Sequence, residues 1–149
     1  MELLKSLLKI SMIAGLACCG DGDEYISDGE KRTDAYVIVN ESGHCVRIDD
    51  TPFDSTKQVE SYIIQTNDSL SFERVSYMHK ARPFKGNVFL TFDDNLKYEC
   101  ELGVGIVQRS PADNSFYTTR KISDDYFVSR YVITEEDYEY AKAHPYKGE

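Results

Sequence analysis

The stretch NVFLTFDDNLKYECEL, residues 87–102, decides the fold expected of this chain. Every second residue from Val88 to Phe92 is apolar, and after the polar run at 93–95 apolar and charged side chains alternate again over 97–102. Alternation with a period of two places one face of a strand in a core and the other in solvent. The stretch therefore predicts a β-hairpin with one buried face.

Segments of the same kind lie on both sides of this hairpin. We expect strands at residues 36–39, 44–49, 59–65, 70–73 and 126–133, with a short additional strand at 104–107. The polar run 40–43 predicts that the first two of these strands form a second hairpin. Thr134, followed three residues later by Asp137, is typical of a helix N-terminus and predicts a short helix over 135–143. About seven short strands and one terminal helix favour an all-β fold, an antiparallel β-sandwich forming a single domain over 35–149.

The composition narrows the class of function. The 149 residues include 17 Lys and Arg against 26 Asp and Glu, which gives a formal net charge of -9. Such a chain repels phosphate backbones, so we expect no nucleic-acid partner. Hydrophobic residues make up 41% of the chain, which is too apolar for a disordered protein.

Residues 1–17 predict a signal peptide. Lys5 and Lys9 precede an uncharged stretch that ends in Cys18 and Cys19. As a helix this stretch rises only about 16 Å, well short of a hydrocarbon core of about 30 Å. A cysteine behind small residues at the end of a leader resembles the bacterial lipobox, in which the cysteine is acylated after cleavage. We expect lipidation at Cys18, with Cys19 as the alternative; an ordinary secretory leader is the other interpretation.

An acidic segment, residues 18–34, follows the leader. Gly alternates with Asp and Glu, and few side chains are available to bury, so we expect a flexible tether between the membrane and the domain. Calcium binding is the alternative. An EF-hand loop beginning at Asp21 would place Tyr25 where an oxygen ligand is needed and Ile26 where glycine is needed, so we expect no metal.

Cys45 and Cys100 belong to the expected domain, and an exported protein meets an oxidising compartment. The strand patterns place Cys45 on the same face as Arg47, and Cys100 on the same face as Tyr98. One face is polar and the other apolar. Two outcomes stay open: a disulfide between Cys45 and Cys100, or one exposed and one buried thiol.

The first strand runs into SGH at 42–44, residues 92–98 are FDDNLKY, and the last strand and helix contain YVITEEDYEYA at 131–141. Together with the leader, these segments resemble a group of small uncharacterised surface lipoproteins of gut Bacteroidetes. The resemblance implies an immunoglobulin-like or transthyretin-like sandwich, held by lipid in the outer membrane at the cell surface, and it brings no catalytic residues. It also makes relevant the short O-glycosylation pattern of these bacteria, which Ser55 and Ser69 match.

Residues that could carry chemistry are sparse. His44, His79 and His144 lack the spacing of metal ligands, and carboxylate pairs such as Asp93-Asp94 stand where turns are expected. We therefore expect no catalytic residue and no cofactor, and a non-enzymatic binding domain whose partner is a glycan or a surface protein. The alternatives are a structural envelope component that assembles with neighbouring proteins, and a hydrolase in which His44 or a carboxylate pair lies in a deep pocket.

Overall fold

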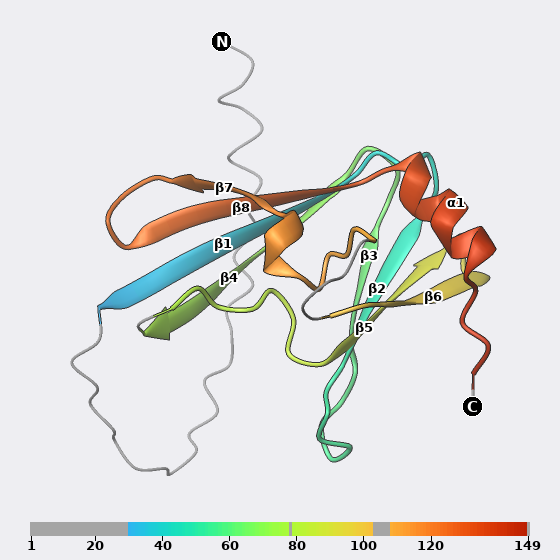
Figure 1. Cartoon of the computed structure of the whole chain (residues 1–149), viewed down its shortest axis with the longest axis horizontal. Helices are drawn as coiled ribbons and strands as arrows, with labels where there is room; N and C mark the ends of the chain where they lie inside the picture. Colours follow the sequence, from blue (N-terminus) through green and yellow to red (C-terminus); the bar gives the residue numbers. More distant parts are fainter. Residues whose placement is uncertain (1–29, 78, 103–107, 149) are drawn as a thin grey trace.

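A computed structural model describes residues 30–77, 79–102 and 108–148 (Figure 1). Within these residues the elements are β1 (Lys31–Asn40), β2 (Val46–Thr51), β3 (Glu60–Ile64), β4 (Ser69–Tyr77), β5 (Asn87–Phe92), β6 (Leu96–Cys100), the 3-10 helix η2 (Asn114–Phe116), β7 (Thr118–Lys121), β8 (Tyr126–Ile133) and α1 (Glu135–Ala143). The expected leader with Cys18 and Cys19, most of the expected tether, and the strand expected at 104–107 lie outside the described residues.

The strands form two sheets whose inner faces share one buried core. Sheet A has the order β4-β1-β8-β7, and sheet B has the order β3-β2-β5-β6. Side chains from β1 and β8 belong to the same apolar cluster as side chains from β2, β5 and β6. The expected all-β architecture with a short C-terminal helix is confirmed. One pairing differs from the expected antiparallel arrangement, because β1 and β8 run parallel.

The hairpin predicted from residues 87–102 forms as β5 and β6, with Phe92 paired to Leu96. Asp93 and Asp94 have φ angles of 48° and 63°. A tight hairpin turn needs positive φ at its central residues, and Asp tolerates that conformation better than most residues. The alternating apolar side chains of β5 are fully buried, as their spacing predicted.

The second predicted hairpin, over residues 36–49, is wrong, because β1 and β2 lie in different sheets. The fully buried Asn40 directs the chain from one sheet to the other. Its amide nitrogen donates to the carbonyl oxygens of His44 at 2.7 Å and Ile64 at 3.0 Å. Its amide oxygen accepts from the backbone N–H of Ser42 at 3.1 Å and from the Ser42 hydroxyl at 2.7 Å. These bonds take the place of the ladder that a hairpin would form.

A second crossing between the sheets meets the first at the same residue. The turn after β3 carries the chain from sheet B to β4 in sheet A, and Asn67 in this turn has a φ of 62°. The backbone N–H of Asn40 donates to the carbonyl of Asp68, and the N–H of Asn67 donates to the carbonyl of Asn40, both at 2.9 Å. Both crossings are therefore fixed by the backbone and side chain of Asn40.

Residues 31–34 and 118–121 form strands that the sequence did not predict. β1 begins at Lys31, so residues 31–34, expected in the tether, belong to a strand. Asp34 is fully buried there and accepts from the guanidinium of Arg32 at 2.8 Å and the backbone N–H of Ala81 at 3.1 Å. β7 was not predicted, because its four residues are all exposed and show no alternation. Burial decides both differences: the acidic Asp34 is inside, and β7 is an edge strand.

The terminal helix α1 forms over the predicted residues 135–143. The carboxylate of Asp137 accepts from the backbone N–H of Thr134 at 2.8 Å and from its hydroxyl at 3.3 Å, which satisfies a donor at the helix start. Ala141 is fully buried, and Tyr138 packs against the core from the same side of the helix. The helix therefore closes one end of the core.

Replacing Asn40 with Ala is expected to lower the free energy of unfolding by about 2–4 kcal/mol, because the buried carbonyls of His44 and Ile64 lose their donor. Denaturant unfolding of the purified protein measures the loss. The matched control is Ser71→Ala on β4, an exposed position expected to change the stability by less than about 0.5 kcal/mol. Equal stability of the two variants would contradict the role assigned to Asn40.

Candidate functional site

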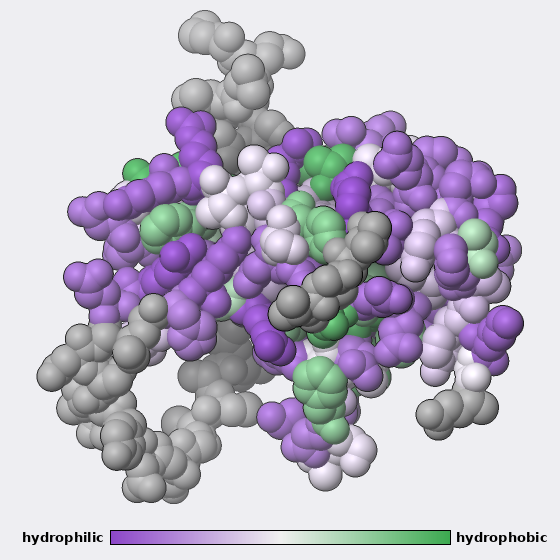
Figure 2. Space-filling view, in the orientation of Figure 1, coloured by the Kyte–Doolittle hydropathy of each residue, from purple (hydrophilic) through white to green (hydrophobic). Residues whose placement is uncertain are grey.

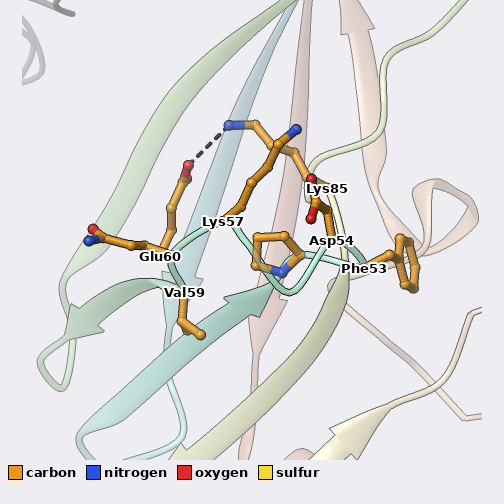
Figure 3. Close-up of a pocket in the computed structure, with 8 residues that line it drawn as sticks. Phe53, Asp54, Lys57, Val59, Glu60 and Lys85 are labelled. Atoms are coloured by element: carbon orange, nitrogen blue, oxygen red, sulfur yellow. Dashed lines mark hydrogen bonds and ion pairs between the residues drawn. The ribbon is translucent and has the colours of Figure 1, made fainter.

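A hollow of about 720 Å³ lies beside the loop of residues 52–59, which joins β2 to β3 and projects from the body of the protein (Figure 1). This site, the loop hollow, is lined by Pro52, Phe53, Asp54, Lys57, Gln58, Val59, Glu60 and Lys85 (Figure 3). Its volume lies in the range of small-molecule sites, about 300–1,000 Å³. The space-filling view shows hydrophobic atoms on the projecting loop among hydrophilic ones (Figure 2).

The base of the loop hollow is fixed by a buried carboxylate. Asp50, only 1% exposed, accepts from the backbone N–H groups of Lys85 at 2.9 Å and Gly86 at 2.8 Å. The close approach requires glycine, since a Cβ at position 86 would lie 1.9 Å from the carbonyl oxygen of Thr51. These contacts fix the distance between the end of β2, which Pro52 follows, and the segment that carries Lys85.

The loop itself is ordered by a second aspartate. Asp54 accepts through one carboxylate oxygen from the backbone N–H of Thr56 at 3.0 Å and from its hydroxyl at 2.7 Å. These two hydrogen bonds lower the pKa of Asp54. The N–H of Lys57 donates to the backbone carbonyl of Asp54 at 3.0 Å. Because the turn satisfies its own polar groups, a ligand would meet a preformed wall.

An ion pair lies across the loop hollow. Nζ of Lys85 is 3.0 Å from one carboxylate oxygen of Glu60, as the dashed line in Figure 3 marks. The hydroxyl of Tyr62 donates to the other carboxylate oxygen at 2.7 Å. The hydrogen bond from Tyr62 is the main cause that lowers the pKa of Glu60, and the hydrogen bond from Lys85 is the next. Among the described residues, the side chains of Lys57 and Gln58 have no hydrogen-bond partner. They are the donors left to a ligand.

The lining combines apolar surface with polar groups. Phe53 is 67% exposed and Val59 is 51% exposed, so both offer apolar surface to the loop hollow. An exposed aromatic ring offers a flat apolar face, while the neighbouring amide, ammonium and carboxylate groups offer donors and acceptors. The arrangement suits a ligand with an apolar face and a polar rim, as the ring of a sugar has.

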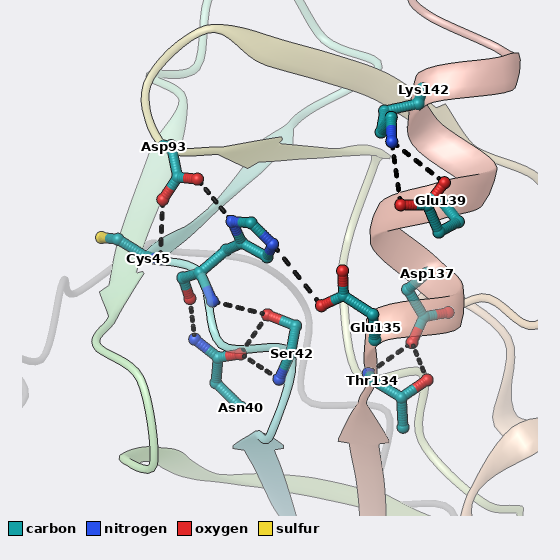
Figure 4. Close-up of polar contacts among 10 residues, drawn as sticks. Asn40, Ser42, Cys45, Asp93, Thr134, Glu135, Asp137, Glu139 and Lys142 are labelled. Atoms are coloured by element: carbon teal, nitrogen blue, oxygen red, sulfur yellow. Dashed lines mark hydrogen bonds and ion pairs between the residues drawn. The ribbon is translucent and has the colours of Figure 1, made fainter.

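A separate polar cluster surrounds His44, where the first crossing between the sheets meets α1 (Figure 4). Its Nδ1 lies 2.5 Å from a carboxylate oxygen of Asp93 in the β5–β6 turn, and its Nε2 lies 3.5 Å from Glu135 in α1. The imidazole stacks on Tyr138 with 3.7 Å between ring centroids. The hydrogen bond to Asp93 is the main cause that raises the pKa of His44. Protonated His44 therefore ties the turn to the helix.

This arrangement does not prepare His44 to act as a base. Both of its ring nitrogens face carboxylates. The nearby hydroxyl of Ser42 donates to the amide oxygen of Asn40. His44 also lines neither the loop hollow nor the three other hollows described for this structure.

Of the two outcomes left open for Cys45 and Cys100, the structure has the free thiols. Cys100 pairs with Val88 at one end of β5, whereas Cys45 lies next to the residue that pairs with Phe92 at the other end. Four residues along a strand span about 13 Å, which exceeds the Cα separation of about 7 Å that a disulfide allows. Cys100 is buried and Cys45 is half-buried, and burial raises the pKa of the Cys100 thiol.

The residues expected to be glycosylated lie apart. Ser55 is exposed in the projecting loop, and Ser69 is the exposed first residue of β4. Their modification stays a prediction. Phe53 and Lys57, which line the loop hollow, were not singled out from the sequence. A large apolar side chain inside a short polar loop was the signal available, since such a residue has no neighbouring strand position to bury it.

The carboxylate pairs are not brought together as a catalytic pair. Asp49 accepts from Arg47 and from the hydroxyl of Ser61, whereas Asp124 forms an ion pair with Lys121 on the far sheet. Among the residues that the structure describes, no three His, Cys, Asp or Glu side chains are grouped so that they could hold a metal ion.

The comparisons with known proteins give no relative. No family model matches the chain, and neither a curated protein nor a solved structure matches it. In the described ranges, no helix has the length and apolar character needed to cross a membrane. The function is therefore inferred from the geometry of the molecule itself.

The His44 cluster predicts a pH-dependent stability. A pKa raised above 6.5 in the folded state means that the cluster stabilises the fold fully below that pH, and that this contribution is lost as the pH rises through the folded-state pKa. His44→Gln should therefore be less stable than the unmodified chain at pH 5.5, and the difference should narrow toward pH 9. Urea unfolding across this range measures it. The matched control, His79→Gln, changes an exposed histidine and should keep the original pH profile of stability. If the difference in unfolding free energy between His44→Gln and the unmodified chain did not change with pH, protonation of His44 would not be coupled to folding.

Proposed function

We propose that this chain is a non-enzymatic, lipid-anchored protein of the outer cell surface whose β-sandwich, of immunoglobulin-like or transthyretin-like type, binds a carbohydrate in the loop hollow. The observation that carries the proposal is the 67% exposure of Phe53 on a preordered loop, in a hollow that is also lined by Lys57 and Gln58, whose side chains make no hydrogen bond among the described residues. Burying an exposed aromatic ring against a ligand recovers apolar surface that the fold leaves in water.

The chemistry of the lining favours a carbohydrate over a purely apolar ligand. Apolar side chains form one part of the loop hollow, and the Lys85–Glu60 ion pair forms another. A sugar presents C–H groups to the apolar side chains and hydroxyl groups to the ion pair, so that both parts of the loop hollow find a matching partner. A purely apolar ligand would remove water from the ion pair and would offer no hydrogen bond in place of those that the water made.

A binding role is favoured over catalysis by the way in which the titratable side chains are used. Asp50 holds the backbone of residues 85–86, Asp54 orders its own turn, and His44 lies between two carboxylates. Each is engaged in a structural contact. A hydrolase would need at least one of them free to exchange a proton with a substrate.

The anchor is supported by the leader, in which Cys18 and Cys19 follow small residues. Metabolic labelling of the full-length chain with a palmitate analogue is expected to give a labelled protein in the membrane fraction. Cys18→Ser should abolish the label, while Cys19→Ser should leave it if Cys18 is the acylated residue. An unlabelled protein with a free amine at its mature N-terminus would overturn the anchor and leave the sandwich proposal to its own test.

The carbohydrate site is tested by screening the full-length chain, purified in mild detergent, on an array of neutral and acidic glycans. At least one glycan is expected to bind, and Phe53→Ala should weaken that binding about tenfold, which corresponds to about 1.4 kcal/mol. Tyr77→Ala is the matched control, because Tyr77 is an aromatic residue 53% exposed on the other sheet. Binding that survives Phe53→Ala, or an array without any bound glycan, would contradict the proposal.

A further inference from the structure

A groove of about 570 Å³ lies on sheet A, away from the loop hollow. We call it the arginine groove. It is lined by Arg109, Phe116, Thr118, Arg120, Ile122, Val128, Arg130 and Val132, which come from β7, β8 and the segments beside them. The lining contains three arginines and no carboxylate, although the chain has 26 Asp and Glu against 17 Lys and Arg. Positive charge is therefore concentrated at one place on an acidic protein.

The pairing of β7 with β8 explains why two of the arginines are neighbours. Thr118 is opposite Arg130, and Arg120 is opposite Val128, so Arg120 and Arg130 lie diagonally across the two strands on one face. Side chains in this relation are about 7–8 Å apart at their Cα atoms, within reach of each other for a long residue. Two like charges at this distance repel, and an anion placed between them would remove the repulsion.

The three guanidinium groups differ in how much they are already engaged. Arg109 lies over the ring of Tyr131, donates to the carbonyl oxygen of Val132, and is 4.0 Å from Asp137. Arg130 has one contact, with Glu41 at 3.5 Å. Arg120 is exposed and has no side-chain partner among the described residues. Arg120 and Arg130 are therefore available to a ligand, and Arg109 supports the wall between them and α1.

Apolar side chains lie between the arginines. Val128 and Val132 are half-buried in β8, and Ile122 at the end of β7 is 55% exposed. The apolar surface continues onto the outer face of β1, where Ala35, Val37 and Val39 are half-buried. A ligand that used only charge would leave this surface in water. The groove instead suits a partner that presents both carboxylates and aliphatic groups.

The edge of sheet A adds a main-chain component. β7 pairs with β8 on one side only, within the part of the chain that the structure describes. An unpaired edge offers backbone N–H and C=O groups to an added strand, and the short, exposed β7 is not covered by a helix there. An extended peptide along this edge would place alternate side chains over the face that carries Arg120 and Arg130.

We propose that the arginine groove is a docking site for an extended, acidic segment of a partner protein, in which carboxylate side chains alternate with aliphatic ones. The carboxylates pair with Arg120 and Arg130, and the aliphatic side chains cover Val128 and Ile122. A bidentate contact between a carboxylate and a guanidinium supplies direction as well as charge. The site is independent of the loop hollow, so the protein can hold a surface carbohydrate and a protein partner at once.

The test is selection from a random dodecapeptide library displayed on phage, with the full-length chain as the immobilised target. Selected sequences should be enriched in Asp or Glu alternating with Val, Ile or Leu. A synthetic, fluorescently labelled peptide of the most frequent sequence should bind in polarisation assays, and R120E/R130E should weaken it at least about tenfold. Because both residues are exposed, the double variant should keep the unfolding midpoint of the unmodified chain. If the double variant is destabilised, the single variant R120Q is used instead, and it should weaken peptide binding about threefold.

The matched control is R82E/K147E, which makes the same change in net charge at two exposed positions outside the groove. It should leave peptide binding unchanged. Equal weakening by both double variants would reduce the effect to overall charge and overturn the proposal. Selected peptides without acidic enrichment would also overturn the proposal. Heparin binding that depends on Arg120 and Arg130, with no acidic peptide bound, would overturn it as well, because the groove would then recognise polyanionic glycans.

Discussion

The buried amide of Asn40 is the contact on which the arrangement of the two sheets depends. It joins the end of β1 to the carbonyls of His44 and Ile64, so that both crossings between the sheets pass through one hydrogen-bonded point. A fully buried amide of this kind is strongly directional, because each of its donors and acceptors must find a partner in the core. The sheets therefore have one relative position, and the loop hollow on sheet B and the arginine groove on sheet A are held apart on a rigid body.

Several of the acidic side chains hold backbone groups of the structure in place. Asp34 holds the backbone of Ala81, Asp50 holds Gly86, Asp93 accepts from the N–H of Cys45, and Asp137 begins α1. In each case a carboxylate from one element satisfies a backbone donor, most of them in a loop or turn. Hydrogen bonds of this type are stronger than those between neutral groups. The same loops border the loop hollow and the His44 cluster, so the acidity of the chain contributes directly to the shape of its surface.

The period of apolar residues predicted the β5–β6 hairpin, and the Thr134–Asp137 pattern predicted the terminal helix, because each element is determined by neighbouring residues. Thr134 and Asp137 lie within one helical turn, and Asp93 and Asp94 form the hairpin turn themselves. The first predicted hairpin failed for the opposite reason. The side chain of Asn40 makes one of its bonds to Ile64, a partner 24 residues away, and no local pattern shows such a contact. β7 was missed because an exposed edge strand has no buried face to mark it.

The positions of the candidate site residues follow the same division. The facing of Cys100 could be predicted from its strand, and its separation from Cys45 could not, because that depends on the register of β2 and β6 against β5. The neighbouring positions of Arg120 and Arg130 likewise arise from pairing between strands. The most direct test of one rigid body is native-state hydrogen exchange of the purified chain. Amides of β1 and β8 in sheet A and of β2 and β5 in sheet B should exchange with the same free energy of opening, equal to that of global unfolding. Exchange of either sheet through a separate, lower-energy opening would contradict the account.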